Sequence, residues 1–371
     1  MKSDAEHTRD LAMLARAARL ALRGHGGAEP NPLVGCVIAH GDRIVADGMH
    51  RICGEAHAEA MALARAGDDA RGATAYVTLE PCNHHGRTPP CSHALVAAGV
   101  ARVVYAQPDP NPIAVGGAET LREAGIRVDL VASRPCNDLN APFLHRLATR
   151  LPWVTAKWAQ TIDGNIATRT GDSKWISCER SRRMVHRERG RVDVIMTGLG
   201  TATADDPALT ARSGTARRTA LRVLIDPQLA APTTLRLLDI ANAPTLVACL
   251  PHLVHGGPAN GLRERGVDVA ALGPRGQIRP LLEALVRERA ISNVLVEAGG
   301  GLTGDLLRED LVNEAWVFVA PRTLGDVEGR RPIRGDAPER LAEARSWRLV
   351  SSRLRGGDVV LRYRRGNGHA S

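Results

Sequence analysis

Aromatic residues are scarce in this chain, since Phe, Trp and Tyr together account for 3% of its 371 residues. Proteins that bind single-stranded nucleic acid commonly stack bases on aromatic side chains, so this scarcity argues against such a role. The net charge of +9 does not reverse the argument, because the arginines are spread along the chain and form no basic block interleaved with aromatics. Lysines are confined to Lys2, Lys157 and Lys174. We expect no nucleic-acid partner and interpret the arginines as suited to small phosphorylated substrates.

Long apolar segments are also missing from the sequence. It contains no run of about 18 apolar residues, the length that a helix needs to cross a bilayer. The polar start, residues 1–7, lacks the apolar stretch of a signal peptide. We therefore expect no membrane partner and a cytoplasmic location.

The chain has 7 cysteines, an odd number that favours metal binding over a disulfide framework. Two of them, Cys82 and Cys91, combine with His57 in three short segments: HAE at 57–59, EPC at 80–82, and a later cysteine. One imidazole and two thiolates can hold Zn²⁺ and leave the fourth tetrahedral position to water, as catalytic zinc sites do. This pattern is typical of zinc-dependent nucleobase deaminases.

Glu59 lies two residues after His57, too close in the chain to be a sensible fourth ligand. It is well placed to take a proton from water and pass it to the ring and to the leaving ammonia. We therefore predict Glu59 as the catalytic residue of a deaminase. The alternative is a closed structural zinc site with one further ligand, for which the candidates are Cys53, His50, His84 and His85.

The pattern of apolar residues predicts two α/β domains, over 1–148 and 149–371. In the first domain we expect helices over 4–23, 57–66, 91–98 and 118–124, and strands over 33–39, 44–46, 74–79, 102–106 and 127–131. In the second we expect helices over 179–189, 278–288 and 304–308, and strands over 153–159, 192–197, 221–225, 245–249, 267–270, 293–297, 314–319, 347–354 and 358–364. Alternating strands and helices indicate mostly parallel sheets covered on both faces.

Two glycine-rich turns in the second domain have the composition of phosphate-binding turns. The first covers 197–201, and the second, 299–304, fits G-x-G-x-x-G before a helix. The second match is weak by itself, because it lies near the end of the chain and no acidic residue on a following strand is placed to hold a ribose. A plain tight turn stays open as the alternative.

At this point the first domain resembles a known family, the bifunctional riboflavin-biosynthesis deaminase/reductases. The resemblance rests on PNPxVGC at 30–36, HAE, EPCxHHGRTPPC at 80–91 and DPNP at 109–112. It implies zinc ligands His57, Cys82 and Cys91, proton shuttle Glu59 and substrate contacts Asn31 and His50, with the His/Arg/Thr loop at 84–88 reaching the ribose phosphate. Asn83 stands where the family usually has Ser, which we expect to have little effect. The segment after DPNP, with Gly116-Gly117, is one residue shorter than usual.

The resemblance extends over the second domain and implies a dihydrofolate-reductase-like α/β fold that uses NADPH. It rests on KWA at 157–159, Ser173-x-Trp175, the turn 198–201, DDPxLTxR at 205–212 and VExGG at 296–300. The residues implied to face the cofactor are Ala159, Trp175, Thr201, Asp205, Gly299, Gly300, Gly301, Leu302, Thr303 and Gly304. Those implied to face the substrate are Ser173, Arg189, Leu209, Arg212 and Glu297. A guanidinium can hold a phosphate through two parallel hydrogen bonds, which gives the arginines a physical reason.

Together these features predict a cytidine-deaminase-like three-layer α/β/α domain followed by the reductase domain. The resemblance implies zinc-dependent deamination of a diaminopyrimidinone that carries a ribosylamino phosphate, then reduction of the ribosyl group to ribityl by NADPH. It also suggests a homo-oligomer. Three other functions stay open: a deaminase with an inactive second domain, a nucleic-acid deaminase, and a zinc-stabilised binding module without catalysis.

Overall fold

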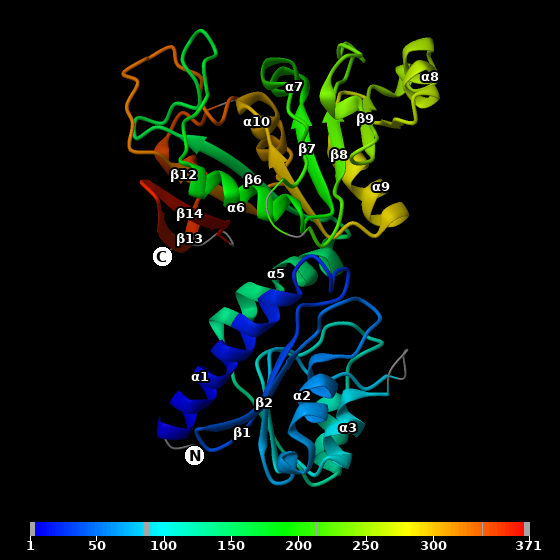
Figure 1. Cartoon of the computed structure of the whole chain (residues 1–371), viewed down its shortest axis with the longest axis vertical. Coiled ribbons are helices and arrows are strands. Elements are labelled where there is room, and N and C mark those ends of the chain that lie inside the picture. Colours follow the sequence, from blue (N-terminus) through cyan, green and yellow to red (C-terminus); the bar gives the residue numbers. More distant parts are fainter. Residues whose placement is uncertain (1–3, 85–88, 213, 215, 336, 367–371) are drawn as a thin grey trace. The chain divides into compact units, whose positions relative to one another are not determined.

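A computed structural model describes residues 4–84, 89–212, 214, 216–335 and 337–366. They form two compact units, which divide the chain between Thr149 and Arg150 (Figure 1). Each unit has its own sheet and its own hydrophobic clusters. No helix in these ranges is both long enough and apolar enough to cross a membrane.

The first unit is built around a sheet with the strand order β2-β1-β3-β4-β5. Its strands are β1 (Gly35–His40), β2 (Arg43–Met49), β3 (Thr74–Val77), β4 (Arg102–Tyr105) and β5 (Arg127–Leu130). Its helices are α1 (Asp4–Ala21), α2 (Ala58–Ala66), α3 (Cys91–Ala97), α4 (Gly117–Glu123) and α5 (Arg134–Thr149). β1 runs antiparallel to β2 and β3, which confirms the expected hairpin, and β3, β4 and β5 are parallel.

Alternation along β1 shows how the sheet is covered on both faces. Ile38 packs in a cluster with Ala62 of α2 and Leu95 of α3, whereas its neighbour Val37 packs with Leu14 of α1 on the other face. Successive strand residues point to opposite faces, so one apolar strand needs a helical layer on each side. The first unit therefore has the three-layer α/β/α arrangement expected from the sequence.

The second unit contains a larger sheet with the order β10-β9-β8-β7-β11-β6-β12-β14-β13. Its strands are β6 (Trp153–Gln160), β7 (Val194–Gly198), β8 (Leu221–Ile225), β9 (Thr245–Cys249), β10 (Asp268–Ala271), β11 (Asn293–Glu297), β12 (Glu314–Val319), β13 (Trp347–Arg355) and β14 (Asp358–Arg365). Its helices are α6 (Glu179–Arg189), α7 (Leu199–Asp205), α8 (Gly257–Glu264), α9 (Arg279–Arg289) and α10 (Gly300–Arg308). Strands β6 to β12 are parallel, and β13 and β14 form an antiparallel hairpin at one edge.

Three helices were absent from the sequence-based prediction: α5, α7 and α8. α5 contains Pro142, a residue that normally breaks a helix. The prediction for α10 was also wrong at its start, because the helix begins at Gly300 rather than Gly304. The glycine-rich segment is thus mainly the first part of a helix. Short 3₁₀ segments complete the structure at Leu22–Gly24, Gly67–Ala70, Arg236–Leu238, Pro251–Leu253 and Leu341–Glu343.

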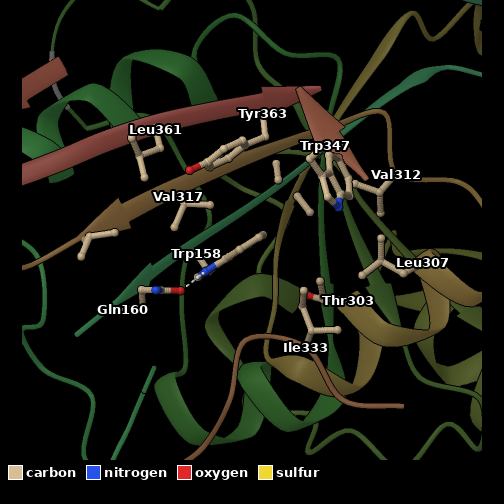
Figure 2. Close-up of a pocket in the computed structure, with 13 residues that line it drawn as sticks. Trp158, Gln160, Thr303, Leu307, Val312, Val317, Ile333, Trp347, Leu361 and Tyr363 are labelled. Carbon is tan, nitrogen blue, oxygen red and sulfur yellow. Dashed lines mark hydrogen bonds between the residues drawn. The ribbon is translucent and has the colours of Figure 1, made fainter. Parts of the chain in front are cut away.

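An apolar pocket of about 320 Å³ lies on one face of the second sheet (Figure 2). Trp158 of β6, Tyr363 of β14 and Trp347 of β13 line it, with Leu307 and Thr303 of α10. The Trp158 indole donates a hydrogen bond of 2.7 Å to Gln160 Oε1, so its polar atom is satisfied within the wall. Of the predicted site residues, Thr303 alone contributes to the lining.

Candidate active site

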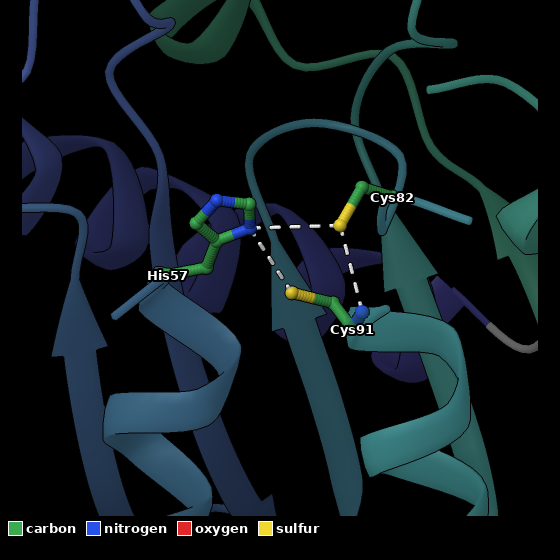
Figure 3. Close-up of side chains that lie close together, drawn as sticks. All are labelled: His57, Cys82 and Cys91. Atoms are coloured by element: carbon green, nitrogen blue, oxygen red, sulfur yellow. Dashed lines mark hydrogen bonds between the residues drawn. The ribbon is translucent and has the colours of Figure 1, made fainter. Parts of the chain in front are cut away.

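The three predicted zinc ligands converge in the first unit (Figure 3). His57 caps the start of α2, Cys91 is the first residue of α3, and Cys82 follows β3. His57 Nδ1 lies 3.3 Å from Cys91 Sγ and 3.5 Å from Cys82 Sγ. Residues that are far apart in the sequence therefore meet at the carboxyl end of a parallel strand.

The spacing of these three atoms fits a zinc ion. Zn–S bonds of about 2.3 Å and Zn–N bonds of about 2.0 Å at tetrahedral angles place sulfur and nitrogen about 3.5 Å apart. The hydrogen bond between the two cysteines, together with His57, lowers the pKa of Cys82 to about 4, while the same bond and burial raise the pKa of Cys91, so one of the pair is a thiolate. A thiolate is the form of cysteine that binds metal. No fourth residue joins the cluster within the described ranges, so Cys53, His50 and His84 do not complete a closed site; His85 lies outside those ranges.

Glu59 lies in the first turn of α2 and its side chain is 3% exposed. Burial raises the pKa of Glu59 to about 7, and the neighbouring Cys82 adds to the shift. A group whose pKa is near neutrality can both accept and return a proton at physiological pH. A buried, titratable carboxyl therefore lies beside the three candidate ligands.

Asn31 and His50 lie next to each other near this cluster. His50 Nδ1 donates to the carbonyl of Ala56 at 3.2 Å, so its Nε2 accepts from Asn31 Nδ2, also at 3.2 Å. Burial lowers the pKa of His50, which favours this neutral tautomer. The rings of His50 and His57 meet edge to face, with centroids 5.2 Å apart. The predicted phosphate contact lies in the His/Arg/Thr loop at 84–88, of which 85–88 are outside the described residues.

Comparison with known proteins covers both units. The family model described as "Cytidine and deoxycytidylate deaminase zinc-binding region" matches residues 7–107, and the one described as "RibD C-terminal domain" matches 152–361. The riboflavin biosynthesis protein RibD of Actinobacillus pleuropneumoniae is 39% identical over 360 residues, which are 95% of this chain and 95% of that protein. The RibD protein of Escherichia coli is 39% identical over 365 residues, covering 94% and 97%.

This chain belongs to the RibD family. Solved structures agree: Acinetobacter baumannii RibD, form 1, is 36% identical with a TM-score of 0.82, covering 98% of this chain and 100% of that chain. A diaminohydroxyphosphoribosylaminopyrimidine deaminase/5-amino-6-(5-phosphoribosylamino)uracil reductase from Thermotoga maritima is 31% identical with a TM-score of 0.82, covering 97% and 99%.

Membership of the RibD family confirms the main sequence-based predictions. The chain is a bifunctional enzyme of riboflavin biosynthesis, with a deaminase domain followed by a reductase domain. The cytidine-deaminase-like fold of the first domain is also confirmed, and the second domain has the α/β sheet of a RibD C-terminal domain; its likeness to dihydrofolate reductase stays a prediction. The family uses zinc in the first domain and a nicotinamide cofactor in the second, and acts on small phosphorylated pyrimidines.

The reductase domain contains a buried ionic cluster of Lys157, Arg189 and Glu297. β6 and β11 are adjacent parallel strands, and their register aligns Lys157 with Glu297. Lys157 Nζ lies 3.5 Å from Glu297 Oε2, and Arg189 of α6 donates to both carboxylate oxygens, including a bond of 3.0 Å from its Nη2. Burial alone would raise the pKa of Glu297, but the charges of Arg189 and Lys157 lower it to about 2. Glu297 is therefore held as a carboxylate.

Arg189 also donates to the carbonyl of Thr210, so three of its N–H groups bind the protein itself. This pairing gives Arg189 a structural role beside Glu297 and argues against it as the main phosphate-holding residue. Arg212 differs, because it is exposed and no carboxylate in the described ranges pairs with it. Burial lowers the pKa of Arg212, and Arg189 and Arg236 add to the effect, so the local potential is positive.

The two glycine-rich turns of the reductase domain meet each other. The backbone N–H of Gly299 donates to Thr201 Oγ1 at 2.9 Å, and the side chain of Leu302 lies beside Gly198. Both turns are strand-to-helix junctions, at the ends of the adjacent strands β7 and β11. The sequence indicated two separate turns, and the fold combines them into one surface.

The glycines of α10 have different surroundings. A Cβ atom on Gly304 would lie 1.5 Å from the Arg334 carbonyl oxygen, and one on Gly300 would lie 2.5 Å from that of Arg331. Gly301 has open space at the same position, and it is exposed. Close backbone packing therefore explains Gly300 and Gly304, and Gly301 faces outward at the junction.

Three further predicted site residues of the reductase domain lie before α6 and at the end of α7: Ser173, Trp175 and Asp205. Trp175 is 61% exposed and stacks under Arg182, with 4.6 Å from the guanidinium carbon to the ring centroid. Its neighbours in the loop before α6 include Ser173. Asp205 ends α7, and its carboxylate lies 4.0 Å from Lys174 Nζ.

Two predicted residues pack into the interior of the same domain. Ala159 packs beside a core cluster. The side chain of Leu209 belongs to that cluster at 3% exposure, so its placement argues against the predicted side-chain contact with substrate.

Lys157 was not predicted as a site residue. The sequence feature that could have identified it is its position, a lysine inside an apolar strand in a chain where lysine is rare. Such a residue almost always has a partner when it is buried.

Proposed function

We propose that this chain deaminates 2,5-diamino-6-(5-phosphoribosylamino)pyrimidin-4-one and then reduces 5-amino-6-(5-phosphoribosylamino)uracil with NADPH. The observation that carries the first step is the triangle of His57, Cys82 and Cys91 with buried Glu59 beside it. Membership of the RibD family supports the substrates, which are those named for the Thermotoga maritima relative.

In the deaminase domain, His57, Cys82 and Cys91 hold the zinc ion, which when bound acts as a Lewis acid and activates water. Glu59 accepts one proton from the attacking water and gives it to the ring nitrogen, then carries the remaining hydroxyl proton to the departing amine. The C–N bond to the exocyclic amine breaks, a C–O bond forms and ammonia leaves. Asn31 and His50 contact the substrate, and their mutual hydrogen bond sets the orientation of both.

In the reductase domain, NADPH supplies a hydride to C1′ of the ribosyl group, and a proton completes the reduction to ribityl. The junction of Thr201 with the segment 299–304 supports the cofactor, together with Ala159, Trp175 and Asp205. Glu297 and Ser173 face the substrate, and exposed Arg212 binds its phosphate. Arg189 acts through Glu297, because it keeps that carboxylate ionised. The family also suggests a homo-oligomer, which light scattering would test.

The test uses purified, zinc-loaded protein with the diaminopyrimidinone ribosylamino phosphate. Ammonia release and loss of NADPH absorbance are followed separately, and NADH replaces NADPH in a parallel assay. Both signals are expected, with NADPH preferred. Ammonia without NADPH oxidation would mean that the second domain is inactive, and neither signal would overturn the proposed substrate.

The Glu59→Gln variant is the first control. It keeps the size of the side chain and removes the carboxylate, so ammonia release should fall at least about 100-fold. Reduction of the deaminated substrate by NADPH should be unchanged in this variant, because the reductase residues lie in a separate unit. Normal ammonia release from Glu59→Gln would remove Glu59 from the mechanism.

A further inference from the structure

Asn83 directly follows the candidate ligand Cys82 and accepts two hydroxyl hydrogen bonds through one side-chain oxygen. Ser92 Oγ donates to Asn83 Oδ1 at 2.7 Å, and Thr120 Oγ1 donates to the same atom at 3.1 Å. Ser92 follows Cys91 in α3, and Thr120 lies in α4. One amide oxygen thus joins the segment that carries Cys82 to two different helices.

Two backbone N–H groups at the start of α3 also donate hydrogen bonds to Cys82. The N–H of Cys91 donates to Cys82 Sγ at 3.5 Å, and the N–H of Ser92 donates to the Cys82 carbonyl at 3.2 Å. Ser92 is fully buried, and its hydroxyl finds its acceptor in Asn83 Oδ1. A buried donor without an acceptor costs free energy, and the segment would shift to avoid this cost. Any such shift changes the separation of the two cysteines.

The segment 81–83 also contacts the start of α4 and the loop before it. The N–H of Asn83 donates to the carbonyl of Ala114 at 3.1 Å, which fixes its backbone to the loop before α4. A Cβ atom on Gly117 would lie 1.7 Å from the Pro81 carbonyl oxygen, so α4 approaches this segment as closely as a glycine allows. Gly116 has a φ of 101°, a conformation that glycine adopts without strain.

We propose that Asn83 is a positioning residue for the metal centre, which sets the separation of Cys82 and Cys91 by holding Ser92 and Thr120. This inference rests on the proposed zinc site. It differs from the sequence-based expectation that Asn83 in place of Ser has little effect, because the shorter serine side chain cannot bring its oxygen to the position of Oδ1. Groups that orient metal ligands commonly change metal affinity 10- to 100-fold when removed.

The test measures how fast zinc leaves the full-length protein when a chromophoric chelator is added in excess. Asn83→Ala should release zinc about tenfold faster than the wild type. Asn83→Asp keeps the accepting oxygen and should release zinc at close to the wild-type rate. Asn137→Ala, at an exposed position in α5, serves as the control and should have no effect.

A second measurement separates positioning from general stability. With cobalt in place of zinc, the intensity of the thiolate-to-metal absorption reports the geometry of the two cysteines, and Asn83→Ala should change it. Metal-free Asn83→Ala should unfold at a somewhat lower temperature than wild type, because Ser92 loses its acceptor, and both proteins should be folded at the temperature of the zinc-release assay. If Asn83→Ala does not fold, Thr120→Val tests the same link, since valine has nearly the shape of threonine without its hydroxyl.

The outcomes are distinct. Wild-type protein that holds no zinc would overturn the proposed metal site and this inference together. If the wild type holds zinc, and Asn83→Ala or Thr120→Val releases it at the wild-type rate with an unchanged cobalt spectrum, the positioning role alone is overturned. Release from Asn83→Asp as fast as from Asn83→Ala would also overturn it, because the accepting oxygen would then be irrelevant.

Discussion

Glu297 is a buried carboxylate that two neighbouring cations keep ionised. Its pKa of about 2 lies below the ordinary value of 4.5. A depressed folded-state pKa adds stability that is present above pH 4.5 and is lost as the pH falls towards 2. A shift of this size corresponds to about 3 kcal/mol at neutral pH, as an upper estimate. The residue therefore couples the stability of the reductase domain to pH.

We predict that Glu297→Gln lowers the free energy of unfolding of this domain by up to about 3 kcal/mol at pH 7. The difference from wild type should shrink as the pH falls from about 5 towards 2, because the carboxylate of the unfolded chain takes up a proton near pH 4.5 while the folded one stays ionised until about pH 2. All 5 tryptophans of the chain lie after residue 150, so tryptophan fluorescence in urea reports this domain. Exposed Glu283→Gln is the control; a pH-independent difference for Glu297→Gln would contradict the prediction.

Arg212 is the arginine that we propose to bind the substrate phosphate in the reductase domain. It is exposed, and two neighbouring arginines make its surroundings positive. Arg212→Gln should raise KM for the phosphorylated uracil about tenfold or more and change kcat less, because a phosphate remote from C1′ is bound equally before and during hydride transfer. Arg187→Gln, on an exposed position of α6, is the control. An unchanged KM would remove Arg212 from the phosphate site.

At the scale of elements, α10 provides a matched pair of glycines. Gly304→Ala should destabilise the reductase domain by about 2 kcal/mol or more, because the new methyl group would meet the Arg334 carbonyl. Gly301→Ala has open space and replaces a poor helix former, so the domain should keep or gain up to about 1 kcal/mol. If Gly301 faces the cofactor, the same change should raise KM for NADPH. Urea unfolding and steady-state kinetics check both effects, and equal stability losses would contradict the packing argument.

Elements with a strong apolar pattern were predictable. Strands β8, β9 and β11 have the predicted bounds, because strands buried on both faces read as continuous apolar runs. α6 was also predicted with its observed bounds, Glu179–Arg189. The missed helices either contain a proline, as α5 does, or are short and follow a glycine, as α7 and α8 do. Short segments carry too little periodicity to be recognised.

At the scale of the whole molecule, the two units have separate cores, so each should fold and work alone. We predict that residues 1–149, expressed alone, release ammonia, and that residues 150–371 oxidise NADPH with the deaminated substrate. Each isolated unit should keep at least about a tenth of the activity that it has in the full chain, since each hydrophobic cluster draws its residues from one unit. Loss of either activity in a folded unit would mean that the units depend on each other.

The sequence by itself indicated the reaction class, because a His with a Glu two residues later and two cysteines further along form a pattern typical of zinc-dependent deaminases. It also determined the two-domain plan through the alternation of apolar strands and helices. Tertiary structure alone decided which glycines pack and which face outward, that Arg189 pairs with Glu297, and that Asn83 links two helices. These depend on distances between residues far apart in the chain, which local pattern and propensity do not encode.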